Sequence, residues 1–314
     1  MEYLFLVIGF ALLIIGAYWL VEGATSLATL TKIPKVIMGL SVVAIGTSLP
    51  ETAVSITAAI EGNSEMAIAN VVGSNIFNIL MITGICALIK VLPSNNEILK
   101  RDFPWAMSST IILIIILADV YISRIDGVIL IICMAIYLFM MQGDAEEHRE
   151  GYQYIESHKY ENVIQNQPAF KSILQIVIGL VFVVIGGKLV VDDATIIAIH
   201  LGMSQTLMGL TVVAIGTSLP ELVTSIVAVK KGEVDLAIGN IIGSNIFNGF
   251  VVLGASALCS PLKASVLDIA DVGLMLIATG AVYFFSWHND KTTRSEAVAC
   301  IGLYIAFLVY IFLR

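Results

Sequence analysis

The sequence predicts an all-α integral membrane protein whose ten transmembrane helices form two inverted five-helix repeats. Three observations predict this fold: a strongly apolar composition, ten segments long enough to cross a bilayer, and a second half that repeats the first. Of the 314 residues, 58% are hydrophobic and only 13% are charged. A soluble domain carries about 25% charged residues, so these side chains could not cover the surface of a soluble globule.

A helix needs about 20 mostly apolar residues to cross the hydrocarbon core, and the chain contains ten such segments. The predicted spans are residues 3–21, 36–60, 66–89, 104–122, 126–142, 172–191, 206–229, 236–259, 266–286 and 296–313. The first has no basic start and no small-residue cleavage site, so we interpret it as a span and not as a cleaved signal.

A polar segment separates the spans into five and five. The sequence therefore predicts a first five-helix repeat at 1–142, a linker at 143–170 and a second, inverted five-helix repeat at 171–314. The linker carries six acidic residues. We interpret it as a solvated tether, with a Ca²⁺-binding segment as the alternative.

Lysine and arginine predict the orientation. The linker and the other loops after odd-numbered spans hold twelve of these residues, and the opposite side holds four. Cytoplasmic loops are enriched in Lys and Arg. We therefore expect a multi-pass protein of the cell membrane, with the 143–170 linker in the cytoplasm and both termini outside.

Two classes of ligand are disfavoured. The net charge is −8 and the chain has no basic run, so no nucleic-acid partner is expected. The four cysteines stand alone in apolar runs, without a second Cys or a His at ligand spacing. We interpret them as buried thiols, and not as a disulfide framework or a zinc site.

The repeat has a fixed offset of 170 residues, which lays positions 4–80 on the second half without a gap. The segment Val42–Glu51 recurs unchanged at Val212–Glu221, and Gly73–Asn78 recurs unchanged at Gly243–Asn248. Because each copy has five spans, the second must enter the membrane from the opposite face. Inverted repeats with a midplane site at their interface are a design of secondary transporters.

The repeat places one glutamate in each half, Glu51 and Glu221, inside a predicted span. A charged side chain at the bilayer centre costs about 2.5–3.5 kcal/mol on insertion scales, so it indicates a functional site. Inverted symmetry would bring the two carboxyls together. Two close carboxylates out of water cannot both ionise unless cations neutralise them. The alternative is a protonated glutamate hydrogen-bonded between helices.

Neighbouring residues supply further oxygens. Pro50 and Pro220 lack an N–H and predict kinks at Gly46–Thr47 and Gly216–Thr217, where carbonyls become free to line a cavity. The repeated hydroxyl and amide side chains belong to Ser48, Ser74, Asn78, Ser218, Ser244 and Asn248. Hard oxygen ligands suit Ca²⁺ and Na⁺ and disfavour soft transition metals. The alternative for these small and polar residues is helix packing.

The paired GTSLPE and GSNIFN motifs resemble the two α-repeats of sodium/calcium exchangers, within the Ca²⁺:cation antiporter superfamily, and the prokaryotic members most. The resemblance covers both halves and the linker. It implies that spans 2, 3, 7 and 8 form the ion-binding core, and that the long, tilted spans 1 and 6 slide across it.

The resemblance also implies a site. Ca²⁺ would bind the carboxylates of Glu51 and Glu221 and the carbonyls of Thr47 and Thr217. Two flanking Na⁺ sites would use, respectively, Ala44, Ser48 and Ser74, and Ala214, Ser218 and Ser244. Asn78 and Asn248 would close the middle. Some members, including potassium-dependent exchangers, have Asp at the position of Asn248, so an Asn in both halves argues against potassium cotransport.

We therefore expect an antiporter, not an enzyme, that exchanges Na⁺ for Ca²⁺ by alternating access. Its ligands would be the transported ions and the lipid bilayer, with no cofactor and no protein partner inferred. A Ca²⁺/H⁺ antiporter that uses the same glutamate pair is the main alternative. An intramembrane acid protease and a passive cation channel are the other two.

Overall fold

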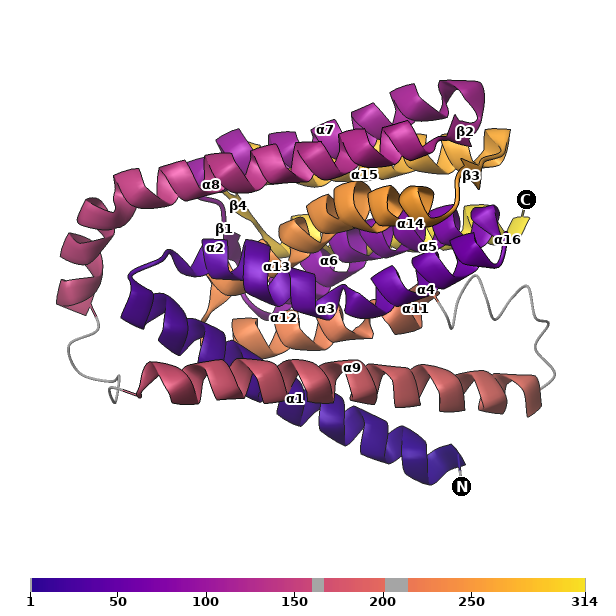
Figure 1. The fold of residues 1–314 in the computed structure, drawn as a ribbon. Coiled ribbons are helices and arrows are strands. Elements are labelled where there is room, and N and C mark those ends of the chain that lie inside the picture. The colour runs from indigo at the N-terminus through magenta and orange to yellow at the C-terminus, as the bar shows by residue number, and fades with distance from the viewer. Residues whose placement is uncertain (1, 160–166, 201–213, 314) are drawn as a thin grey trace.

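The computed structural model describes residues 2–159, 167–200 and 214–313, and they are almost entirely helical (Figure 1). The first half contains α1 (Glu2–Thr31), α2 (Lys35–Met38), α3 (Ala44–Thr47), α4 (Leu49–Ile60), α5 (Ser64–Ile76), α6 (Thr83–Ile89), α7 (Phe103–Ile116) and α8 (Arg124–Lys159). The second half contains α9 (Ala169–His200), α11 (Ala214–Thr217), α12 (Leu219–Lys231), α13 (Val234–Phe247), α14 (Leu253–Cys259), α15 (Val266–Asn289) and α16 (Arg294–Leu313).

Short turns of other helical types join several of these helices. The π-helical turns are η1 (Gly39–Val43), η2 (Phe77–Ile82), η3 (Ile98–Asp102) and η6 (Asn248–Val252), and η4 (Leu117–Asp119) is a 3₁₀ turn. Because most of them continue directly into an α-helix, they lengthen a span and do not end it.

Among the described residues, eight helices are long and apolar enough to cross a bilayer. A bent pair, Lys35–Thr47 with Leu49–Ile60, can count as a ninth. The predicted all-helical membrane fold is therefore confirmed, and the nine spans lie where the sequence predicts them. The tenth predicted span is 206–229. Its residues 206–213 lie outside the described part of the chain, and its remaining residues form α11 and most of α12.

Three helices are longer than predicted. The sixth span was expected at 172–191, but α9 extends from Ala169 to His200. The first span was expected to end at residue 21, but α1 continues to Thr31, because no helix-breaking residue precedes Pro34. The linker was expected to start at residue 143, but α8 continues to Lys159. Residues 144–159 contain no proline and several good helix formers, so the helix continues after the apolar segment ends.

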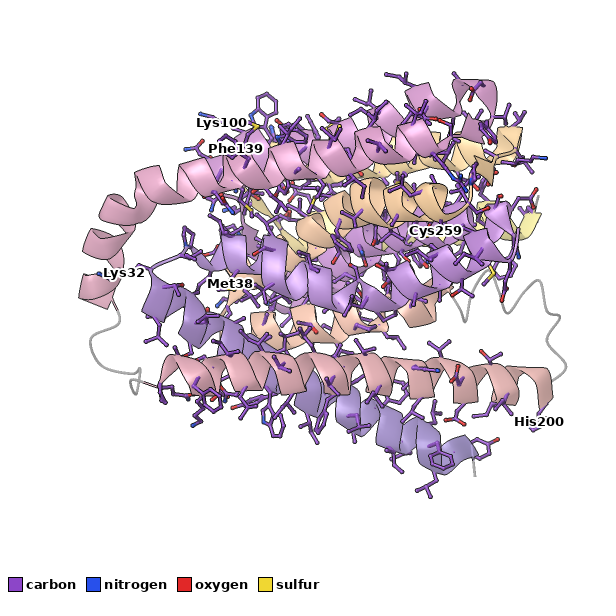
Figure 2. The ribbon with its side chains drawn as sticks, in the orientation of Figure 1. Lys32, Met38, Lys100, Phe139, His200 and Cys259 are labelled. Atoms are coloured by element: carbon purple, nitrogen blue, oxygen red, sulfur yellow. The ribbon has the colours of Figure 1, made fainter. Side chains whose placement is uncertain are left out.

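Helix α13 lies at the centre of the bundle, and all of its residues are buried apart from Asp235, which is partly exposed. It packs against α2, η1, α3 and α12, while α5 packs against α4. The outer helices α1, α7, α8, α9 and α16 carry many exposed apolar side chains, such as Phe139 on α8, which is 77% exposed (Figure 2). Such an outer surface is suited to lipid and would be unfavourable in water.

Four two-residue strands join loops from the two halves. β1 (Leu92–Pro93) pairs antiparallel with β4 (Lys291–Thr292), and β2 (Tyr121–Ile122) pairs antiparallel with β3 (Leu262–Lys263). The offset of 170 places β1 on β3 and β2 on β4. The residue pairs of one ladder are therefore equivalent to the residue pairs of the other. The two ladders lie at opposite ends of the bundle (Figure 1).

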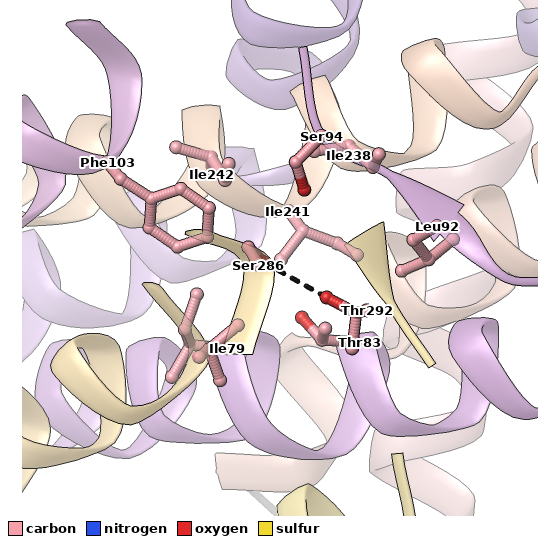
Figure 3. Close-up of a pocket in the computed structure, with 11 residues that line it drawn as sticks. Ile79, Thr83, Leu92, Ser94, Phe103, Ile238, Ile241, Ile242, Ser286 and Thr292 are labelled. Carbon is pink, nitrogen blue, oxygen red and sulfur yellow. Dashed lines mark hydrogen bonds between the residues drawn. The ribbon is translucent and has the colours of Figure 1, made fainter. Parts of the chain in front are cut away.

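A small cavity of about 20 Å³ lies beside the β1–β4 ladder (Figure 3). Its lining is apolar apart from hydroxyl side chains, including Ser286 and Thr292, whose oxygens are 3.0 Å apart. This volume holds about one water molecule, and the lining carries no charge. The equivalent residues near the β2–β3 ladder are Ile116 and Ile122, so the two ends of the bundle differ in polarity.

Helices α1 and α9 cross in close contact at one side of the bundle (Figure 1). Gly9 faces Gly186 and Gly16 faces Gly179, and the two glycines on each helix are seven positions apart. A Cβ atom on Gly179 would lie 2.6 Å from the Leu20 nitrogen and 2.8 Å from the Gly16 oxygen. Only glycine therefore lets the two backbones approach this closely.

We expect Gly179→Ala to destabilise the purified protein by about 1–3 kcal/mol, the usual cost of an added group in a closely packed contact. The measurement is the unfolding midpoint in detergent. Gly280→Ala on α15 is the matched control, because a Cβ atom there meets nothing within 4 Å. Equal midpoints for the two variants would contradict the close α1–α9 contact.

Candidate functional site

The first feature of the site is a break in the second span. α3 ends at Thr47, α4 begins at Leu49, and the two segments are bent by 46°. Ser48 between them has φ −86° and ψ 11°. Pro50 lies in the first turn of α4 and cannot donate to the carbonyl of Gly46. The predicted kink is therefore confirmed, with the break at Ser48.

The second half repeats this geometry at Ser218, which has φ −90° and ψ 6° between α11 and α12. As a result, Glu51 and Glu221 each lie in the first turn of a helix, α4 and α12 respectively. The positive end of the helix dipole stabilises negative charge at that position. The break therefore positions each carboxyl at a helix N-terminus inside the bundle.

The two glutamates are bonded across the halves of the chain. Both are fully buried. Ser218 donates to Oε1 of Glu51 at 3.2 Å, and Ser48 donates to Oε1 of Glu221 at 2.9 Å. Each half therefore supplies a hydroxyl to the carboxyl of the other half. The repeat therefore forms one shared centre from residues 170 positions apart.

Each carboxyl has a second oxygen that is unsatisfied. Oε2 of Glu51 and Oε2 of Glu221 are buried and have no hydrogen-bond partner among the described residues. Burying a polar oxygen without a partner is costly, and two buried carboxylates repel each other. The pair therefore needs a proton or a cation. A group that is ionised in this dry setting requires the cation.

Other unsatisfied atoms belong to the same predicted set. Within the described chain, twelve buried side-chain atoms have no hydrogen-bond partner, and seven of them come from the predicted site residues. Besides the two glutamates, these residues are Ser74, Asn78, Ser244 and Asn248. Such a concentration of unused oxygen and nitrogen atoms is typical of a binding site.

The π turns η2 and η6 lie at equivalent positions of the two halves and contain Asn78 and Asn248. Such turns are rare and are frequent at functional sites. Asn248 donates to Oδ1 of Asn75 at 3.1 Å, whereas both amide atoms of Asn78 lack a partner among the described residues. The two halves therefore differ in hydrogen bonding here.

The remaining predicted residues lie on the short helices before the breaks. Ala44 is buried at the start of α3. Ala214 begins α11, but its side chain lies outside the described part of the structure. Thr47 and Thr217 end these helices, and their hydroxyls donate to Oδ1 of Asn240 and Oδ1 of Asn70, at 3.1 and 3.2 Å.

Four asparagines were not predicted as site residues. Asn75 and Asn245 donate to each other's main-chain carbonyl, both at 3.1 Å, and Asn70 and Asn240 contact the threonines. The signal that could have identified them is the same offset, because each pair is 170 residues apart. Among the described residues, no group of three or more His, Cys, Asp or Glu could hold a metal.

Comparisons with known proteins identify the family of the chain. A family model described as sodium/calcium exchanger protein matches residues 1–142 and 171–313. The chain belongs to the sodium/calcium exchanger family. The predicted family is thus confirmed, and the protein is a membrane exchanger, a transporter rather than an enzyme.

Several relatives match nearly the whole chain. The putative antiporter CaxA of Alkalimonas amylolytica is 37% identical over 99% of this chain and 97% of its own length. The sodium/calcium exchanger MaX1 of Methanosarcina acetivorans is 31% identical over 99% of this chain and 98% of its own. A structure of the sodium-calcium exchanger NCX_Mj, soaked with Na⁺ and Ca²⁺, has a TM-score of 0.84 at 30% identity, covering 98% of this chain and 97% of that one.

We expect Ser48→Ala to destabilise the ion-free protein by about 1–3 kcal/mol, because it leaves Oε1 of Glu221 buried without a donor. The measurement is the unfolding midpoint in Na⁺-free buffer with a chelator. The control is Ser256→Ala, which removes a buried hydroxyl that bonds only the Val252 carbonyl of its own turn, at 2.8 Å. A Ser48→Ala midpoint no lower than that of the control would contradict the cross-half bond.

Proposed function

We propose that the protein is a secondary active antiporter that exchanges Na⁺ for Ca²⁺ across the cell membrane by alternating access. The observation that carries this proposal is the pair of fully buried carboxyls, Glu51 and Glu221, each with one unsatisfied oxygen. One Ca²⁺ or two Na⁺ would neutralise the pair. Two of the relatives are named as a sodium/calcium exchanger and a putative antiporter, which supports the same ions and the same type of transport.

In this proposal the carboxylates of Glu51 and Glu221 and the carbonyls of Thr47 and Thr217 bind Ca²⁺. Ca²⁺ takes 6–8 hard oxygen ligands at about 2.3–2.6 Å, so amide oxygens and water would complete the shell. The flanking Na⁺ ligands are Ala44, Ser48 and Ser74 and, in the other half, Ala214, Ser218 and Ser244. Asn78 and Asn248 close the centre. The buried, unsatisfied atoms of Ser74, Ser244 and both asparagines support this assignment.

The charge of the site explains the coupling. An empty site carries about two negative charges and resists passage through an apolar barrier, whereas a loaded site is near neutral. Only loaded forms would therefore change sides, so flux is exchange and not leak. In this mechanism α1 and α9 slide as a pair over the core, which their glycine contact and exposed apolar surface support.

We further propose that the chain is two inverted five-span repeats, at 1–142 and 171–314, joined by a cytoplasmic segment at 143–170. The reciprocal serine–glutamate bonds and the equivalent registers of the two strand ladders support this symmetry. The β1–β4 ladder joins two loops that the lysine distribution assigns to the cytoplasm. An ion pair of 2.9 Å between Lys35 and Glu233 joins two further loops that are assigned to the cytoplasm. Both ends of the chain lie at the other end of the bundle (Figure 1), in agreement with termini outside.

We expect Glu51→Gln or Glu221→Gln to reduce Na⁺-driven ⁴⁵Ca²⁺ uptake by proteoliposomes to the background of empty liposomes, because an amide cannot supply the charge that balances Ca²⁺. The control is Glu61→Gln, which changes an exposed glutamate at the end of α4 and is expected to leave uptake intact. Undiminished uptake in both buried variants would refute the site assignment.

A second experiment identifies the counter-ion. Proteoliposomes loaded with Na⁺ are expected to take up Ca²⁺, while vesicles loaded with choline take up none, whatever pH gradient is imposed. Uptake without Na⁺ that requires a pH gradient would instead establish the Ca²⁺/H⁺ alternative. Ca²⁺ current without any counter-ion, detected by electrical recording, would indicate a passive channel.

A further inference from the structure

Two buried asparagines outside the proposed ion ligands, Asn70 on α5 and Asn240 on α13, occupy equivalent positions in the two halves. They are 5% and 0% exposed. A primary amide offers two N–H donors and one carbonyl acceptor. In both residues the two N–H donors and the carbonyl acceptor all form hydrogen bonds. The partners of these bonds explain why an amide is suited to this position.

Asn240 links both halves of the chain. Its amide nitrogen donates to the main-chain carbonyl of Glu221 at 3.3 Å and to the hydroxyl of Ser225 at 3.0 Å. Its Oδ1 accepts from the hydroxyl of Thr47 at 3.1 Å. The side chain therefore joins the backbone of one glutamate to the threonine that precedes the other.

Asn70 makes the same three contacts in reverse. Its amide nitrogen donates to the main-chain carbonyl of Glu51 at 3.3 Å and to the hydroxyl of Ser55 at 2.9 Å. Its Oδ1 accepts from the hydroxyl of Thr217 at 3.2 Å. Corresponding distances in the two halves agree closely, so the arrangement is a repeated unit and not an isolated contact.

We propose that Asn70 and Asn240 are positioning residues that fix the geometry of the Ca²⁺ site and thereby favour Ca²⁺ over Na⁺. The proposal rests on the proposed function. The two amides touch all four residues that would bind Ca²⁺, and each joins a glutamate of one half to a threonine of the other. Because the amides are neutral, they add no third charge beside the two carboxylates.

The effect should be specific to Ca²⁺. A divalent ion held by carboxylates and threonine carbonyls needs both halves at one fixed separation, which the amide bridges set. The proposed Na⁺ ligands, such as Ser48 and Ser74, receive no bond from either amide among the contacts described. Loss of an outer partner of a metal ligand typically lowers metal affinity by about 10–100-fold.

The first experiment compares saturation by the two ions in proteoliposomes. Asn240→Ala and Asn70→Ala are each expected to raise the KM for Ca²⁺ by about tenfold or more. The Na⁺ concentration that gives half-maximal exchange should change by less than about twofold, because neither amide bonds the proposed Na⁺ ligands among the described contacts. Asn245→Ala is the matched control: it removes a buried amide from the same helix α13 that bonds the Asn75 carbonyl. It is expected to leave the ratio of the two constants unchanged.

A double-mutant cycle tests the bond across the halves. Thr47→Val removes the hydroxyl that reaches Asn240 but keeps the proposed carbonyl ligand, so it should raise the KM for Ca²⁺ on its own. In the double variant with Asn240→Ala, Thr47→Val should raise the KM for Ca²⁺ little further, because Asn240→Ala has already removed the Thr47–Asn240 bond. Combined with Asn70→Ala the two effects should multiply. Thr47→Ser keeps the hydroxyl and should restore the wild-type KM.

Several outcomes would overturn the proposal. Equal changes in the half-saturating concentrations of Ca²⁺ and Na⁺ would indicate a general structural role. Multiplicative effects of Thr47→Val with both Asn240→Ala and Asn70→Ala would indicate the same. If Asn240→Ala does not fold, Thr47→Val still tests the same bond, and an unchanged KM for Ca²⁺ would reject the proposal. In each case wild-type Na⁺-dependent exchange would stand. Absence of that exchange in the wild-type protein would instead overturn the proposed function and this inference together.

Discussion

The structure depends on burying two carboxyls, Glu51 and Glu221, in one dry centre. Buried charges are expensive because protein contacts replace their hydration only in part. The surrounding elements reduce that cost in three ways. Each carboxyl lies in the first turn of a helix, each accepts a bond from a serine of the other half, and the nearby amides are neutral. None of these removes the mutual repulsion, so the centre still needs a proton or a cation, and in the proposed function a transported cation supplies the charge.

The residues around the symmetric centre differ between the two ends of the bundle. At the end that holds the β1–β4 ladder, Lys231 lies 3.3 Å from Oε2 of Glu22 and 3.3 Å from the ring centroid of Tyr18, which ties α12 to α1. The offset of 170 places Glu61 and Asp192 at the equivalent positions. These two residues are both acidic, so the same attraction is unavailable at the other end. Duplication therefore conserves the ion-binding residues while the charges of the two ends diverge.

The sequence was sufficient to predict features that are local or repeated. Apolar length predicted nine spans that the structure contains, Pro50 predicted the break beside Ser48, and the unchanged motifs singled out the glutamates. The sequence could not predict the contacts between the halves. The repeated motif identifies Ser48 and Ser218, but it does not show which carboxyl each serine bonds. The π turns at Asn78 and Asn248 add one residue to a helical turn and leave no compositional signal. Asn70 and Asn240 were missed because a buried amide looks the same in sequence whether it packs helices or positions a ligand.

The hydrogen bonding of the two GSNIFN segments bears on how such a site could change sides. Their sequences are identical, yet Asn248 bonds Asn75 while the amide of Asn78 has no partner among the described residues. The residues after the motif differ, being Ile79–Ile82 in one half and Gly249–Val252 in the other. One motif is therefore held in two hydrogen-bonding arrangements, each beside different neighbouring residues. In the antiporter proposed above, an exchange of these two arrangements between the inverted halves would be one local change that accompanies alternating access.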